Sequence, residues 1–192
     1  VKRGEVEAPK RTFNLQALKA EQRRAEQERL EELRNTIQAK MQGSEKFKAI
    51  SSQVRLDMTR DGLRIQIVDD QNRPMFDSGS AVVKPYMREL LRAIGELLGE
   101  VPNLLTLEGH TDATPFPGGE RGYSNWELSA DRANASRREL MAGGLDERRI
   151  LRVTGLASSQ LFERDSPTHP SNRRISIIVM NREAEDRVFK PE

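Results

Sequence analysis

The chain has 192 residues, of which 35% are hydrophobic and 32% are charged, and its net charge is only +2. This length suits one domain of ordinary size with an extension, and the balanced charge lacks the concentrated basic face of a nucleic-acid-binding protein. Cysteine is absent, which excludes disulfides and thiolate metal sites.

The ends of the chain bear on its cellular context. No apolar run reaches the roughly 18 to 20 residues that cross a bilayer, and no secretory signal is recognisable. The sequence begins with Val1 instead of Met, so we expect a longer parent chain.

The first fifty residues are predicted to lie outside the main domain. Residues 1–12 contain Gly4, Pro9 and mixed charges, and we expect a disordered leader. Residues 13–50 are predicted to be a linker or dimerisation helix. Its regular part is 13–41, where Ala, Leu, Gln, Glu and Arg dominate and Gly and Pro are absent.

The predicted helix carries one narrow apolar stripe. Its members follow one another at helical spacing: Leu30, Leu33, Ile37 and Met41. A heptad pattern is not sustained, which argues against a long coiled coil. Two alternatives remain open: a spacer helix that docks on the domain through its C-terminal half, or a helix that pairs with a second copy.

Residues 51–182 are predicted to form the main domain. Apolar and polar residues alternate over 54–58 and 63–67, with Asp61-Gly62 between them, which predicts a β-hairpin with one buried face. A helix is predicted from Pro85 to the break at Gly99.

The second half of the domain alternates strands and helices. We expect a strand at 104–109, a helix at 125–142, a strand at 150–154, a polar loop at 156–171, a last strand at 174–180 and a flexible tail at 183–192. This order predicts an α+β fold, with one mixed sheet and helices on one face.

A carboxylate and a guanidinium flank the loop between the 104–109 strand and the next helix. Asp112 follows the strand, and Arg132 lies two turns inside a helix opened by the capping box of Ser124 and Glu127. Such a pair can form a salt bridge, or it can hold a zwitterion by offering Asp112 to an ammonium and Arg132 to a carboxylate. The residues alone leave both alternatives open.

Three motifs in this order resemble the signature of the OmpA-like peptidoglycan-binding family: Gly109-His-Thr-Asp112, Asn125-x-x-Leu-Ser-x-x-Arg-Ala133 and Asn172-Arg-Arg174. The resemblance covers roughly residues 52–182 and implies a two-layer OmpA-like domain. It also implies that Asp112 and Arg132 grip the zwitterionic end of diaminopimelate in the peptidoglycan stem peptide. Four further residues match positions that line the same pocket: Thr114, Asn125, Leu128 and Arg174.

The loop between Asp112 and Asn125 departs from the family pattern. It is longer than usual and carries Pro115, Phe116 and Pro117. We expect this loop to alter access to the pocket.

Residues 114–116 and 123–132 are more similar still to family members that anchor flagellar motor stators to the cell wall. The resemblance implies a periplasmic domain of a single-pass inner-membrane protein, whose upstream part holds a transmembrane helix with an acidic residue. The resemblance also implies four binding partners: peptidoglycan, a second copy of the chain, the stator A subunit and the flagellar P-ring. The alternatives are an outer-membrane lipoprotein or porin anchor without a motor role, and a cell-wall hydrolase.

Two residues invite a metal or catalytic interpretation that the sequence does not sustain, and a third invites one as a sugar-binding surface. His110 lies beside Asp112, but no third metal ligand is evident, and we expect it to bond neighbouring backbone. Ser129 lacks a histidine base and a nucleophile-elbow turn. Trp126 is interpreted as a core anchor or loop clamp in preference to a sugar-stacking surface. We therefore predict a binding module, not an enzyme, with no metal and no cofactor.

Overall fold

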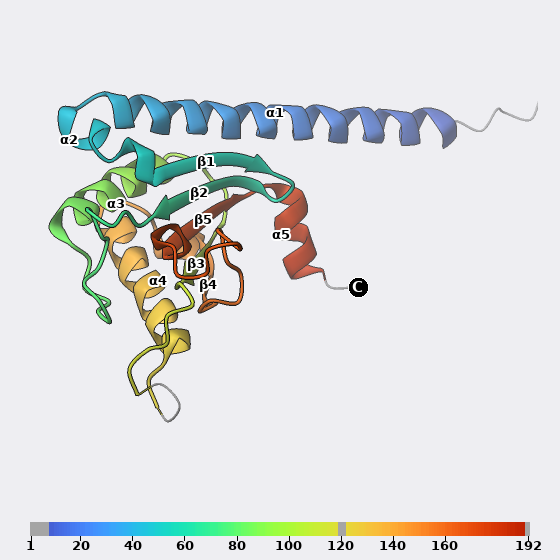
Figure 1. Ribbon diagram of the computed structural model, residues 1–192. Coiled ribbons are helices and arrows are strands. Elements are labelled where there is room, and N and C mark those ends of the chain that lie inside the picture. Colours follow the sequence, from blue (N-terminus) through green and yellow to red (C-terminus); the bar gives the residue numbers. More distant parts are fainter. Residues whose placement is uncertain (1–7, 119–121, 191–192) are drawn as a thin grey trace, which may run out of the picture.

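The computed structural model describes residues 8–118 and 122–190. The elements in chain order are α1 (Ala8–Gln42), α2 (Glu45–Lys48), β1 (Val54–Thr59), β2 (Gly62–Val68), α3 (Pro85–Leu98), β3 (Leu105–His110), α4 (Asn125–Ala142), β4 (Ile150–Gly155), β5 (Arg174–Met180) and α5 (Arg182–Phe189) (Figure 1). Short 3-10 turns precede β1, β4 and β5. None of these helices combines the length and apolarity needed to cross a bilayer.

The five strands form one sheet in the order β1-β2-β5-β3-β4. β3 and β4 run parallel, whereas the other neighbours are antiparallel. α3 and α4 pack against each other, and α4 also packs on β3 and β4. The predicted hairpin, the two central helices and the mixed sheet are confirmed.

The two faces of the sheet differ sharply in polarity. Leu63 pairs with Val179 and Ile65 with Ile177, and all four side chains are fully buried in the core beneath the helices. The intervening residues face the other side, where Gln66 pairs with Ser176. Strand side chains alternate between the two faces of a sheet. In β5 the odd-numbered residues therefore face the core, and the even-numbered residues face the polar side.

Two glycines let α4 lie close to the sheet. A Cβ at Gly109 on β3 would come within 2.0 Å of the Ser129 carbonyl oxygen, and one at Gly155 on β4 within 2.5 Å of the Ala130 nitrogen. No larger residue could keep this packing. The first turns of α4 are thereby held beside the end of β3, which Asp112 follows.

α1 docks through its C-terminal half and continues past the body of the domain (Figure 1). Its apolar stripe is buried, with Leu30 and Ile37 each only 1% exposed, whereas Leu18 is 52% exposed. The structure thus shows the docked alternative, and pairing with a second copy stays a prediction. The helix begins at Ala8, so the disordered leader was wrong for residues 8–12, while residues 1–7 lie outside the described part.

The expected flexible tail at 183–192 was also wrong over most of its length, because α5 occupies Arg182–Phe189. The Asn181 side chain accepts a hydrogen bond from the Ala184 amide at 2.9 Å and so caps the helix. Glu185 in turn accepts a bond from the Leu104 amide at 3.0 Å. These contacts tie α5 to the sheet, and residues 191–192 lie outside the described part.

The docking of α1 can be tested by shortening one buried side chain. We expect Ile37→Ala to lower the free energy of unfolding by about 2–5 kcal/mol, because it leaves a cavity between α1 and the domain. The exposed control Leu18→Ala should change it by less than about 0.5 kcal/mol. Urea unfolding followed by circular dichroism measures both, and equal small effects would mean that α1 does not dock.

Candidate binding site

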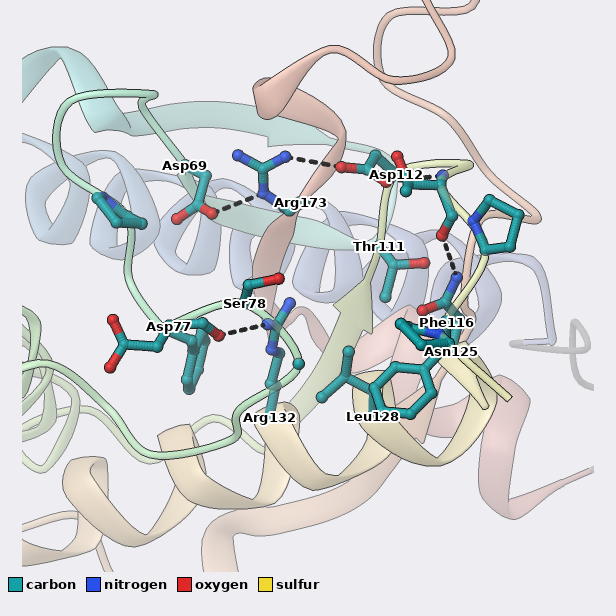
Figure 2. Close-up of a pocket in the computed structure, with 16 residues that line it drawn as sticks. Asp69, Asp77, Ser78, Thr111, Asp112, Phe116, Asn125, Leu128, Arg132 and Arg173 are labelled. Atoms are coloured by element: carbon teal, nitrogen blue, oxygen red, sulfur yellow. Dashed lines mark hydrogen bonds and ion pairs between the residues drawn. The ribbon is translucent and has the colours of Figure 1, made fainter. Parts of the chain in front are cut away.

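A cavity of about 750 Å³ opens where the end of β3, the start of α4 and the loop before α3 converge. Figure 2 shows the carboxylates of Asp69 and Asp112 and the guanidinium groups of Arg132 and Arg173 gathered around it. Five of the six residues predicted from the sequence line this cavity: Asp112, Thr114, Asn125, Leu128 and Arg132. The structure therefore brings together side chains from both sides of the long loop.

Arg132 is buried, and its partners in the described part of the chain are backbone oxygens and an aromatic ring. It is only 6% exposed, and its Nε donates to the Ser80 carbonyl oxygen at 2.9 Å while Nη2 donates to that of Asp77 at 3.2 Å. The guanidinium also lies over the Phe76 ring, 4.9 Å from its centroid. Among the described residues no carboxylate forms an ion pair with it. Burial lowers its pKa from the usual value, which reflects the cost of holding this charge away from water.

Asp112 is engaged by a different arginine. Its Oδ2 accepts a hydrogen bond from Arg173 Nη1 at 2.7 Å, and its Oδ1 accepts one from the Thr114 amide at 2.8 Å. The side chain of Asp112 is 10% exposed. Asp112 and Arg132 therefore do not cancel each other, and each keeps a separate set of partners.

Arg173 bridges two aspartates from distant parts of the chain. Its Nε donates to Asp69 Oδ2 at 2.9 Å while Nη1 holds Asp112 (Figure 2). The other oxygen of Asp69 accepts a bond from the Met75 amide at 2.6 Å. Burial raises the pKa of Asp69, and the bond from Arg173 opposes that shift. The bridge thus stabilises buried carboxylates and fixes the orientation of Asp112.

The prediction that Arg174 lines the pocket was wrong. Arg174 Nε donates to Gln66 Oε1 at 3.1 Å and Nη2 to the Gln160 carbonyl oxygen at 2.8 Å, both away from the cavity. Burial lowers its pKa to about 10. The reason is strand parity: residue 174 shares the polar face with Ser176, whereas Arg173 lies on the same side as the core residue Ile175.

The long loop is fastened to α4 at its base. Asn125 Nδ2 donates to the Thr114 carbonyl oxygen at 2.9 Å, and the rings of Phe116 and Tyr123 lie 5.2 Å apart. The predicted capping box is present, with the Ser124 amide donating to Glu127 Oε2 at 2.7 Å. Phe116 sits at the rim of the cavity, so the loop shapes the entrance. Residues 119–121 lie outside the described part.

The remaining polar candidates do not enter the cavity. His110 is buried on the polar face of the sheet, with its Nε2 3.4 Å from Glu108 Oε2. Within the described part of the chain its ring nitrogens make no hydrogen bond, contrary to the expected backbone contact. Ser129 Oγ donates to the Trp126 carbonyl oxygen at 3.0 Å and accepts from the Ala157 amide at 3.0 Å, a structural role. Across the described residues no group of His, Cys, Asp or Glu is arranged to hold a metal ion.

Comparison of the sequence with known protein families identifies the family of this chain. The pattern that defines the OmpA family matches residues 75–174. The chain belongs to the OmpA family.

Among relatives of this OmpA-family chain, Motility protein B of Escherichia coli K12 is 50% identical over 176 residues, which is 92% of this chain and 56% of the relative. The chain thus spans little more than half of that protein's length. Among solved structures, a putative MotB-like protein from Desulfovibrio vulgaris aligns with a TM-score of 0.63 at 18% identity, over 83% of this chain and 98% of the other. The cell wall anchor of the type VI secretion system from Pseudomonas aeruginosa aligns at 0.57 and 26% identity, over 74% and 95%.

The bridge in this OmpA-family pocket has a consequence for stability. We expect Arg173→Gln to lower the free energy of unfolding by roughly 1–3 kcal/mol at pH 7, because it leaves two buried carboxylates without the donor that satisfies them. The pKa of Asp69 is already raised in the folded protein, and removing Arg173 should raise it further. A raised carboxyl pKa favours the folded state at low pH and disfavours it as pH rises.

The loss of stability in Arg173→Gln should therefore shrink as pH falls from 7 towards 4. Urea unfolding midpoints across this range measure the effect, with Arg164→Gln, an exposed arginine on the 156–171 loop, as the matched control. A loss that is independent of pH would contradict the bridge.

Proposed function

We propose that this chain is a non-catalytic peptidoglycan-binding module that anchors a flagellar motor stator unit to the cell wall. The ligand group in the cavity is the zwitterionic end of diaminopimelate in the stem peptide. The observation that carries this proposal is Arg132, a buried guanidinium that no carboxylate of the described residues pairs with, and that faces a cavity also lined by Asp112.

The charges of the cavity fit a neutral zwitterion. Asp69 and Asp112 balance Arg173 and Arg132, while Asp77 is paired with Lys84 at 2.7 Å. A ligand carboxylate completes the donors of Arg132 in a charge-assisted hydrogen bond. The ligand's ammonium is held by Asp112, whose oxygens keep acceptor capacity beyond the bonds from Arg173 and Thr114. A ligand with only one of the two charges would leave the other group unpaired.

The motor role is supported by the relatives. Half of the aligned residues are identical to a protein named Motility protein B, and a structural neighbour is described as a cell wall anchor. We infer a periplasmic location on a single-pass inner-membrane protein, with the membrane segment and the contact to the stator A subunit in the part of the relatives that this chain does not span. The flagellar P-ring is a further candidate partner.

Firm anchoring needs more than one weak contact. Charge-assisted hydrogen bonds contribute about 1.5–3 kcal/mol each, so one zwitterion alone is held modestly. A homodimer that engages one polymer twice gains from the high effective concentration of the second contact. We therefore include a second copy of this chain in the proposed assembly.

The site is tested by sedimentation with diaminopimelate-containing sacculi. We expect Asp112→Asn and Arg132→Gln each to lower the affinity at least about tenfold, since each removes one charge-assisted contact. Arg138→Gln, an exposed arginine on the same helix, should bind like the unaltered protein. Full retention of both pocket variants, with folding verified by circular dichroism, would refute the site.

Recognition of the zwitterion can be tested by comparing cell walls of different stem-peptide composition. Sacculi with lysine in place of diaminopimelate keep the ammonium and lack the carboxylate that Arg132 is proposed to take. We expect binding to these sacculi to be weaker by at least about tenfold. Equal binding to both kinds of wall would leave peptidoglycan binding standing and overturn the role of Arg132.

A further inference from the structure

Trp126 is exposed at the start of α4, next to the charged cavity. Its exposed fraction is 55%, so of the two roles expected from the sequence, core anchor or loop clamp, the core anchor was wrong. It is also the only tryptophan in the chain. A large apolar side chain left in water beside a binding cavity calls for an explanation, because such positions mark interaction surfaces when they belong to a patch.

Trp126 belongs to a groove of about 920 Å³. The loop residues Pro115, Phe116 and Pro117 line one part of this groove, and Ala157 and Ser158 line another. The same three loop residues also line the charged cavity, as does Asn125. The two hollows are therefore neighbours that share one wall.

The groove differs from the cavity in its chemistry. The cavity contains three aspartates and two arginines, whereas no charged side chain of the described residues lines the groove. Its surface combines an indole, a phenyl ring and two prolines with the hydroxyl groups of Ser124 and Ser158. This surface suits a neutral ligand that has both apolar and hydroxyl-bearing faces, and it does not suit a second zwitterion.

The walls of the groove are fixed by hydrogen bonds. The Trp126 amide donates to Ser124 Oγ at 3.2 Å, and its carbonyl oxygen accepts from Ser129 Oγ at 3.0 Å. The same Ser129 Oγ accepts from the Ala157 amide at 3.0 Å, so the helix and the opposite wall are joined through one hydroxyl. Ala157 holds a left-handed backbone with φ of 48°, a conformation that the surrounding structure must impose.

We propose that this groove is a saccharide subsite that takes a pyranose ring of the glycan strand while the stem peptide occupies the charged cavity. The C–H face of a sugar ring packs on the indole of Trp126, and its hydroxyls meet the serines at the rim. In peptidoglycan the stem peptide is covalently attached to a sugar, so one wall fragment can reach both neighbouring hollows. This inference rests on the proposed function, since it assumes that the peptide is held by Asp112 and Arg132.

Two ligands separate the saccharide contact from the peptide contact. One is a diaminopimelate-containing tetrapeptide, and the other is the same tetrapeptide attached to its disaccharide. We expect the unaltered protein to bind the disaccharide form about fivefold more tightly in calorimetry, and Trp126→Ala to remove that difference without changing the affinity for the free peptide. Phe189→Ala, which removes another exposed aromatic ring far along the chain on α5, is the matched control and should retain the difference.

Because Trp126 is the sole indole, tryptophan fluorescence reports on this groove directly. Its emission should shift with the disaccharide form and stay constant with the free peptide. Equal affinity of the unaltered protein for both ligands would overturn the subsite, as would a Trp126→Ala variant that binds both like the unaltered protein, or both more weakly by the same factor. A failure of the proposed function would look different, because the free peptide would then not bind, or would bind independently of Arg132.

Discussion

The candidate site depends on the way Arg173 holds two buried aspartates at once. By donating to Asp69 and to Asp112, it satisfies the carboxylates that would otherwise attract Arg132. Arg132 is left with backbone carbonyls and an aromatic ring as its partners. Removing a charge from water is costly in a protein, and the cost is greatest where no opposite charge compensates it. We infer that a buried guanidinium kept available in this way binds the anionic group of a ligand.

The fold makes this arrangement rigid. Close packing at Gly109 and Gly155 fixes α4 against β3 and β4, and the capping box fixes its first turn. Asp112 and Arg132 therefore extend from elements whose separation cannot change freely. Preorganised groups of this kind hold a small ligand without first losing conformational freedom. A rigid grip also suits the mechanical role we propose, since an anchor has to resist force on a short timescale without rearranging.

Local signals in the sequence were sufficient to predict most of the helices and strands. The capping box at Ser124 and Glu127, the alternation in β1 and β2, and Pro85 at the start of α3 each act over a few residues, and the structure confirms them. The start of α1 was missed because Pro9 was interpreted as a helix breaker, although proline is tolerated in the first helical turn. α5 was missed because its high charge concealed the Asn181 cap.

The site was only partly predictable, for two different reasons. Arg173 could have been found from parity, because Ile175, Ile177 and Val179 are core residues and residue 173 shares their side of the strand. The resemblance to the family assigned the position to Arg174 instead. Its partner Asp69 lies 104 residues away, and no local pattern connects them. The exposure of Trp126 likewise depends on how the long loop folds beside α4, which spacing along the chain does not determine.

The most direct measurement is a crystal structure of this chain in complex with a diaminopimelate-containing tetrapeptide. We expect the ligand's carboxylate on the Arg132 guanidinium and its ammonium on Asp112, with the bridge from Arg173 to Asp69 and Asp112 intact. A complex in which Arg132 turns to pair with Asp112, or in which the peptide binds outside this cavity, would contradict the account.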